Sequence, residues 1–103
     1  MGPESIIVNA GRLRILAALA REQGRGAEFV RLREATKLTD GNLSAHARRL
    51  AGAGLISIEK RFRDGKPVTS FAITSAGRNA IEEHARELLE AVAAGESQEE
   101  WVD

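Results

Sequence analysis

The chain has 103 residues, enough for one domain with a modest core, and it contains no cysteine, which excludes disulfides and thiolate metal sites. Its formal net charge is zero, yet residues 31–66 carry nine Lys/Arg against four Asp/Glu, whereas residues 79–103 carry one Arg against eight acids. No apolar segment approaches the roughly 20 residues of a membrane span. We therefore expect a cytoplasmic protein with a basic surface for an anionic partner and no contact with a membrane.

Two helices are predicted in the first third of the chain, over residues 9–23 and 28–37. Asn9 is a suitable N-cap for the first, and the Gly-Arg-Gly segment at 24–26 ends it. The apolar side chains expected to face the core are Leu13, Leu16 and Leu19 of the first helix and Phe29, Leu32 and either Ala35 or Thr36 of the second.

A third helix is predicted over residues 40–53, with Thr39 as its N-cap. Leu43, Ala47 and Leu50 recur at helical spacing and define a buried stripe. The opposite face carries Asn42, Ser44, Ala45, Arg48 and Arg49. Small residues at the start of this face allow close approach to a DNA groove, and the arginines can reach a guanine or a phosphate. The alternative is a solvated face with no partner.

A β-hairpin is predicted next, from strands over residues 55–62 and 67–73. Asp64-Gly65 supplies the positive backbone angles of a tight hairpin turn. Alternation places Ile56, Ile58 and Phe62 of the first strand, and Phe71 and Ile73 of the second, on the inner face.

Basic side chains surround the tip of this hairpin. Lys60, Arg61, Arg63 and Lys66 cluster there, and Thr69 and Ser70 add hydroxyl groups. We expect Arg61, Arg63, Lys66 and Thr69 to contact a DNA backbone or minor groove. The alternative is that the charges protect an exposed strand edge from pairing with another chain.

A last helix is predicted from Thr74 or Ser75 to about residue 94, so that residues 1–94 form the domain and residues 95–103 an acidic flexible tail. One stripe of the helix is apolar, and it consists of Ile81, Ala85, Leu88 and Val92, with Leu89 beside it. The helix spans about 30 Å, longer than a three-helix core requires. We expect a homodimer in which Ile6 and Ile7 of a partner chain help to cover the stripe. The alternative is packing on the first helix of the same chain.

The predicted fold is therefore α+β, in the order α-α-α-β-β-α with a long C-terminal helix. The segment LTDGNLSAHARRLAGAGLISIEKRF, followed by GKPVTSFAITSAG, resembles a family of small bacterial winged helix-turn-helix transcriptional regulators, and more distantly the ArsR and MarR repressors. The matching residues are Gly41 to Ser44, His46, Leu50, Ala53 to Leu55, Lys66, Pro67, Thr69, Thr74 and Gly77. Ala47 departs from the pattern, because relatives tend to carry a larger apolar residue there.

This resemblance implies a homodimer that binds a palindromic promoter site in double-stranded DNA and represses transcription. The helix over residues 40–53 would be the recognition helix in the major groove. Residues 60–69, which we call the wing, would contact the backbone or the minor groove. The alternative function is a winged-helix adaptor that binds other proteins and not DNA, since a fold does not determine a function.

Other kinds of site find little support. His46 on the recognition helix is expected to make a hydrogen bond that fixes helix or wing geometry, or else to contact a phosphate. His84 and Glu87 have a spacing found in metal sensors, but the remaining ligands of a zinc site are missing. No catalytic or phosphate-binding motif is present, so we expect neither an enzyme nor a cofactor. The sequence identifies no small-molecule effector.

Overall fold

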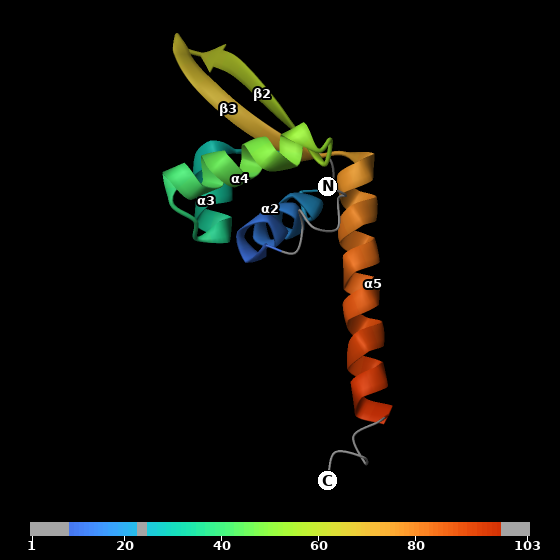
Figure 1. Ribbon diagram of the computed structural model, residues 1–103. Helices are drawn as coiled ribbons and strands as arrows, with labels where there is room; N and C mark the ends of the chain where they lie inside the picture. Colours follow the sequence, from blue (N-terminus) through green and yellow to red (C-terminus); the bar gives the residue numbers. More distant parts are fainter. Residues whose placement is uncertain (1–8, 23–24, 98–103) are drawn as a thin grey trace.

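The computed structural model describes residues 9–22 and 25–97 of the chain (Figure 1). The helices are α2 (Ala10–Ala20), α3 (Phe29–Thr36), α4 (Asp40–Gly52) and α5 (Ser75–Ser97), and the strands are β1 (Ala27–Glu28), β2 (Ile56–Arg63) and β3 (Lys66–Ile73). The α+β class and the predicted order of the elements are confirmed, with the short strand β1 as an addition. Ile6 and Ile7 lie outside the described residues.

The first two helices begin and end through local contacts. The Asn9 side chain accepts hydrogen bonds from the backbone N–H groups of Gly11 (2.8 Å) and Arg12 (3.2 Å), which confirms it as the cap of α2. Helix α3 ends at Lys37, whose φ of 62° is left-handed. Of the two candidates for the inner face of α3, Thr36 is buried and Ala35 is exposed, and the Thr36 hydroxyl donates to the Leu32 carbonyl at 2.8 Å. That bond satisfies a polar group inside the core.

The three strands form one antiparallel sheet in the order β1-β3-β2. The turn between β2 and β3 is the predicted one, with positive φ at both Asp64 (53°) and Gly65 (77°). Strand β1 pairs Ala27 with Phe71 of β3. Two residues are too few to show an alternating pattern, which is why the sequence did not indicate this strand.

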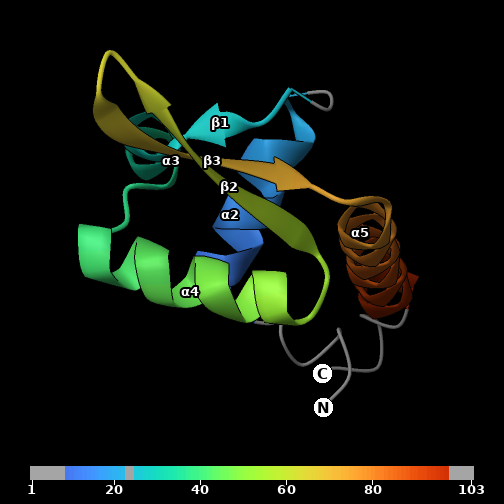
Figure 2. The ribbon, with the colours of Figure 1, turned by 90° about the horizontal axis from the view of Figure 1, so that it is seen from above.

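The core lies between the helices and the inner face of the sheet. Figure 2 shows the sheet above α2, with α4 along one side and α5 at its end. The fully buried large apolar side chains come from α2, α3, α4 and the residue before β2, and they are Ile15, Leu16, Leu19, Leu32, Leu43, Leu50 and Leu55. The predicted stripe of Leu43, Ala47 and Leu50 is thus confirmed as the surface by which α4 packs on the core.

The inward position predicted for Phe62 is wrong. Its side chain is 77% exposed, although it shares a face of β2 with the buried Ile56. The end of the hairpin extends beyond the helices beneath the sheet (Figure 1), so no described element covers the face at this point. Alternation predicted the correct face but not where the core ends.

Helix α5 is attached by its first turns and then leaves the core. The Thr74 hydroxyl accepts from the Gly77 N–H at 3.0 Å and donates to the Gly54 carbonyl at 2.7 Å, so Thr74 is the capping residue. The helix has 23 residues, a length of about 34 Å, and the expected domain boundary between residues 94 and 95 falls within it. The hairpin and α5 extend in opposite directions (Figure 1). Among the described helices, α5 included, none combines the length and apolar character needed to cross a bilayer.

Candidate nucleic-acid interface

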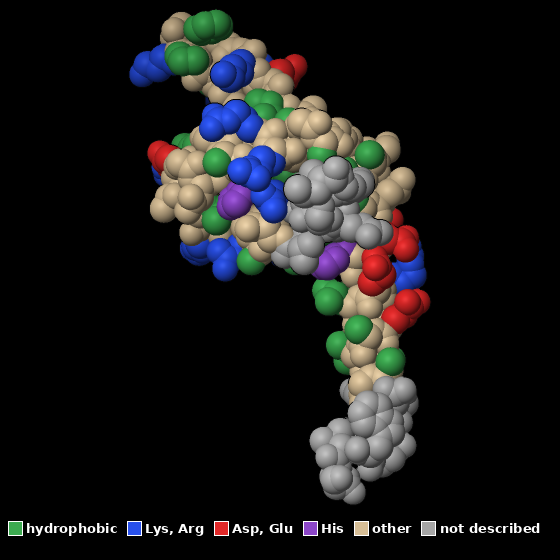
Figure 3. Space-filling view, viewed as in Figure 1, with side chains coloured by type: hydrophobic (Ala, Val, Ile, Leu, Met, Phe, Trp, Pro, Cys, Tyr) green, Lys and Arg blue, Asp and Glu red, His purple; other side chains and the backbone are tan. Residues whose placement is uncertain are grey.

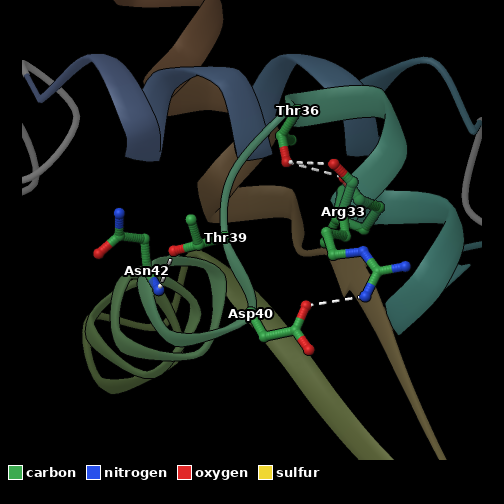
Figure 4. A network of polar contacts seen from close by, with 6 residues as sticks. Arg33, Thr36, Thr39, Asp40 and Asn42 are labelled. Carbon is green, nitrogen blue, oxygen red and sulfur yellow. Dashed lines mark hydrogen bonds and ion pairs between the residues drawn. The ribbon is translucent and has the colours of Figure 1, made fainter.

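The start of α4 is held by two side-chain contacts (Figure 4). The Thr39 hydroxyl accepts a hydrogen bond from the Asn42 N–H at 3.2 Å, as predicted for the N-cap. Arg33 of α3 forms an ion pair with Asp40 at 2.8 Å, and this carboxylate also lies at the positive end of the helix. The side-chain amide of Asn42 takes part in neither contact, and in Figure 4 it points away from both. These contacts fix the first turn of α4 and leave the Asn42 side chain available to a ligand.

The exposed face of α4 carries the polar residues that the sequence predicted. Asn42, Ala45, Arg48 and Arg49 are exposed and Ser44 is half-buried, because the opposite face is occupied by the buried stripe. Among the described residues, no acidic side chain forms an ion pair with either arginine. This face therefore offers small residues at its start and two cations in its second half.

The wing and α4 enclose a hollow of about 260 Å³. Its floor is apolar, and polar side chains from both elements line it: Ser44 and Arg48 from α4, Lys60 from β2 and Thr69 from β3. Lys60 and Thr69 are direct neighbours across the two strands. The hollow is open to solvent between a helix face and a strand face that both carry cations, a suitable surface for an anionic backbone.

Lys60 belongs to the expected wing but was not named as a contact residue, and the structure places it in the hollow beside α4, which Arg61 and Arg63 do not line. Side chains on a strand alternate, so Lys60 shares the inner face of β2 with Ile58, whereas Arg61 and Arg63 share the outer face. The signal was present in the sequence, because Lys60 continues the Ile56–Ile58 alternation.

The two outer arginines of the wing have acidic neighbours. Arg61 lies 3.8 Å from Glu59, and Arg63 forms a close ion pair with Glu28 of β1. The hydrogen bond from Arg63 lowers the pKa of Glu28 below its ordinary value. The partners in the second pair are 58% and 43% exposed, and exposed pairs of this kind contribute little to stability. The guanidinium groups can therefore exchange a carboxylate for a phosphate.

Basic and acidic side chains occupy different parts of the molecule. Figure 3 shows Lys and Arg side chains over the wing and α4, and Asp and Glu side chains mainly along α5. Because α5 extends away from the wing, its described part does not cover the cations of α4. The screening length at physiological salt is about 8 Å, so acids of α5 that lie farther than this from α4 have little effect on its cations.

His46 packs against the start of α2, and its Nδ1 does not make the hydrogen bond expected of this residue. That nitrogen is buried and has no hydrogen-bond partner among the described residues. The imidazole lies over Gly11, where an added Cβ would come within 2.8 Å of the ring. Burial lowers the pKa of His46, and the positive charges of Arg12 and Arg49 lower it further. A neutral ring is thus part of the contact between α2 and α4.

The free energy of unfolding is expected to fall as the pH decreases below about 6.5, the ordinary pKa of histidine. In that range the unfolded chain binds a proton at His46 that the folded chain binds only at lower pH, so acid favours the unfolded state. The free energy of unfolding continues to fall until the pH is below the lowered pKa of His46 in the folded protein. Urea unfolding of the wild type and of His46→Gln between pH 7.5 and 5 measures it.

The His46→Gln variant should lose less stability over this range than the wild type, because glutamine does not titrate. His84→Gln is the matched control for removing a histidine, since His84 lies half-buried on α5. Equal pH dependence of the wild type and His46→Gln would contradict this account.

His84 and Glu87 belong to no group of three or more metal-ligating side chains in the part of the chain that the structure describes.

Over most of its length, the apolar stripe of α5 is not covered by other described residues. Ile81 packs against the core, but Leu88, Leu89 and Val92 are 52%, 70% and 58% exposed, and Ala85 is exposed as well. Within the predicted stripe, Ile81 is therefore the residue that packs against the core of its own chain. Three large exposed apolar side chains close together on one protruding helix are typical of an interaction surface.

Known proteins share both the sequence pattern and the fold. A family model described as a winged helix DNA-binding domain matches residues 12–92. An uncharacterized protein of Methanocaldococcus jannaschii is 36% identical over 63 residues, which are 61% of this chain and 68% of the relative.

Among solved structures, a transcriptional regulator homologue from Pyrococcus horikoshii OT3 superposes with a TM-score of 0.79 at 30% identity, over 87% of each chain. AbsC, a MarR family transcriptional regulator from Streptomyces coelicolor, has a TM-score of 0.69 at 18% identity, over 98% of this chain and 69% of its own. At that identity the second likeness concerns the fold alone.

Proposed function

The chain belongs to the winged helix DNA-binding domain family, and from this membership we propose that it is a homodimeric repressor of transcription that recognises a palindromic site in double-stranded DNA. One observation carries the proposal. Arg48 of α4 and Lys60 of the inner wing border one hollow, and the acidic α5 points away from it. A DNA backbone is the polymer whose charge fits this surface.

In the proposed complex α4 lies in the major groove and the wing lies beside it. Asn42, Ser44, Ala45, Arg48 and Arg49 face base edges, where arginine recognises guanine and asparagine recognises adenine. Thr39 contacts the backbone at the start of the helix. Lys60, Lys66 and Thr69 hold phosphates from the inner face and tip of the wing, and Arg61 and Arg63 do so from the outer face.

The homodimer is supported by the uncovered stripe of α5. Burying Leu88, Leu89 and Val92 against the same residues of a second copy would remove most of the exposed large apolar side chains of the described chain from water. A two-fold dimer that binds a palindromic site must hold its two recognition helices about 34–36 Å apart, one turn of DNA.

The repressor role follows from occupancy. A dimer that fills two successive major grooves and the groove between them excludes other proteins from that stretch of promoter. Repression then requires no surface beyond the one described. The 30% identical P. horikoshii protein, described as a transcriptional regulator homologue, supports a role in regulation.

Binding of the wild-type protein to duplex DNA at increasing salt tests the proposal. The logarithm of affinity should fall linearly with the logarithm of salt concentration, by about 0.9 per phosphate neutralised. Lys60 on the inner face and Lys66 beside the turn, in each of two protomers, predict a slope of about −3.6 or steeper. Sedimentation equilibrium of the same samples should give about twice the 11.1 kDa of one chain.

The competing proposal is an adaptor that binds proteins through the same fold. It predicts no retarded complex with bulk duplex DNA at low salt, or a slope near zero. Either result would contradict DNA binding. The cationic hollow favours DNA over the adaptor, because an adaptor has no need of unpaired cations on both α4 and the inner wing.

A further inference from the structure

The wing ends in an exposed aromatic side chain. Phe62 is 77% exposed, the largest value among the exposed large hydrophobic residues of the described chain. Its direct neighbour across the hairpin is Pro67. The two side chains form an apolar tip that no part of the described chain covers, and neither contributes to the core.

This apolar tip faces the same side as the predicted DNA-binding groups. Pairing in the order Ile58–Phe71, Lys60–Thr69 and Phe62–Pro67 leads along one face of the hairpin. The first pair lies over the core and the second lines the hollow beside Arg48, so the third continues the same surface outward. Two residues of strand separate Phe62 from Lys60 by about 7 Å.

The surroundings of Phe62 decide what covers it. Lys60 lies two residues away on the same face of β2, and Lys66 precedes Pro67 in β3. Arg61 and Arg63 adjoin Phe62 in sequence but belong to the outer face, where they lie against Glu59 and Glu28. This cationic environment opposes self-association of two wing tips, because it would bring like charges together. It favours a partner with a dense negative backbone and apolar surface between the charges. The minor groove of DNA has this character, with deoxyribose walls between two rows of phosphates.

We propose that Phe62 enters the minor groove beside the major groove occupied by α4, where it packs against deoxyribose and base edges while Lys60 and Lys66 hold the flanking phosphates. The inference rests on the proposed function, since it assumes that α4 and the wing bind one duplex. Apolar side chains, Phe and Pro among them, are used in this way by minor-groove proteins. Phe62 then supplies affinity that does not depend on counterion release.

The test compares Phe62→Ala with Lys66→Ala on one specific duplex over a range of salt concentrations. Phe62→Ala should weaken binding roughly tenfold at every salt concentration, with the salt slope of the wild type, because no phosphate contact is lost. Lys66→Ala should make the slope less steep by about 0.9 for each phosphate contact removed. The exposure of Phe62 predicts an unchanged thermal midpoint for Phe62→Ala, so that misfolding does not explain the loss.

Val30→Ala is the matched control, because Val30 is an exposed apolar residue on α3 (54% exposed) and outside the proposed surface. It should bind as the wild type does. Unchanged affinity of Phe62→Ala would overturn the inference and leave DNA binding intact. A less steep slope in Phe62→Ala would overturn it too, since the wing would then act on phosphates alone. Absence of binding by the wild type would overturn the proposed function itself.

A fluorescent variant gives an independent readout. The chain has one tryptophan, so Phe62→Trp combined with Trp101→Phe places the single indole at the wing tip. On binding duplex DNA its emission should shift to shorter wavelength or be quenched, because the ring leaves water and contacts bases. A drug that fills the minor groove should reverse the change. Emission that stays that of a solvated indole in the complex would overturn the inference.

Discussion

Replacing Gly77 by alanine is expected to lower the free energy of unfolding by about 3 kcal/mol, at the upper end of the usual cost of overpacking. Gly77 lies in the first turn of α5, where the helix meets the end of the sheet. A Cβ at this position would be 2.0 Å from the Leu55 carbonyl oxygen and 2.9 Å from Cγ1 of Ile73. The Leu55 carbonyl cannot easily move, because it accepts a hydrogen bond from the Thr74 N–H at 3.0 Å. Backbone must therefore shift.

Thermal unfolding followed by circular dichroism measures this effect, and a decrease of roughly 15 °C in the midpoint is expected for a domain of this size. Gly95→Ala is the matched control, since Gly95 is also in α5 but has no atom within 4 Å of an added Cβ. That variant should be more stable than the wild type by up to about 1 kcal/mol, because alanine favours helix. If Gly77→Ala matched Gly95→Ala, the close approach of α5 to Leu55 would be refuted.

Replacing Arg48 by alanine is expected to weaken binding to the specific site by about 10- to 100-fold, and binding to random duplex DNA much less. Arg48 is exposed on α4 and lines the hollow beside the wing, a position from which a guanidinium can donate two hydrogen bonds to guanine. A base contact of this kind is worth about 1–3 kcal/mol of discrimination. The measurement is a pair of titrations with a selected site and with random duplex.

Lys66→Ala is the comparison variant, because Lys66 lies in the wing, next to the turn, where a phosphate contact is expected. It should weaken the specific and the random duplex by similar factors. Selection of bound duplexes from a random pool would supply the specific site, its symmetry and its half-site spacing in one experiment. Equal effects of both substitutions on every duplex would show that Arg48 reads no base.

Most of the elements could be predicted because their signals are local. Leu43, Ala47 and Leu50 recur with the period of a helix and therefore share one face of α4. Burial of that face determines which side of α4 turns toward the core. The caps at Asn9 and Thr39 and the Asp64–Gly65 turn are bonds and angles within a few residues. For the same reason, the predicted residues of the outer face of α4 are exposed in the structure, except Ser44, which is half-buried beside the wing.

The candidate site was predicted less completely, because its geometry depends on how the wing lies against α4. Lys60 and Arg61 are neighbours in sequence, yet they occupy opposite faces of the hairpin, and only the inner face borders the hollow. The ion pair of Arg63 with Glu28 joins residues 35 positions apart. No local pattern indicates such a pair.

By itself, the sequence determined the class of fold, the order of helices and strands, and the face of each that turns inward, since each depends on contacts between near neighbours. Only the tertiary structure decided that Phe62 is beyond the edge of the core, that His46 rests on Gly11 and that Gly77 touches the Leu55 carbonyl. These three outcomes depend on where separate elements come to rest against one another. That placement is set by close packing among residues far apart in the chain, which periodicity and local propensity do not encode.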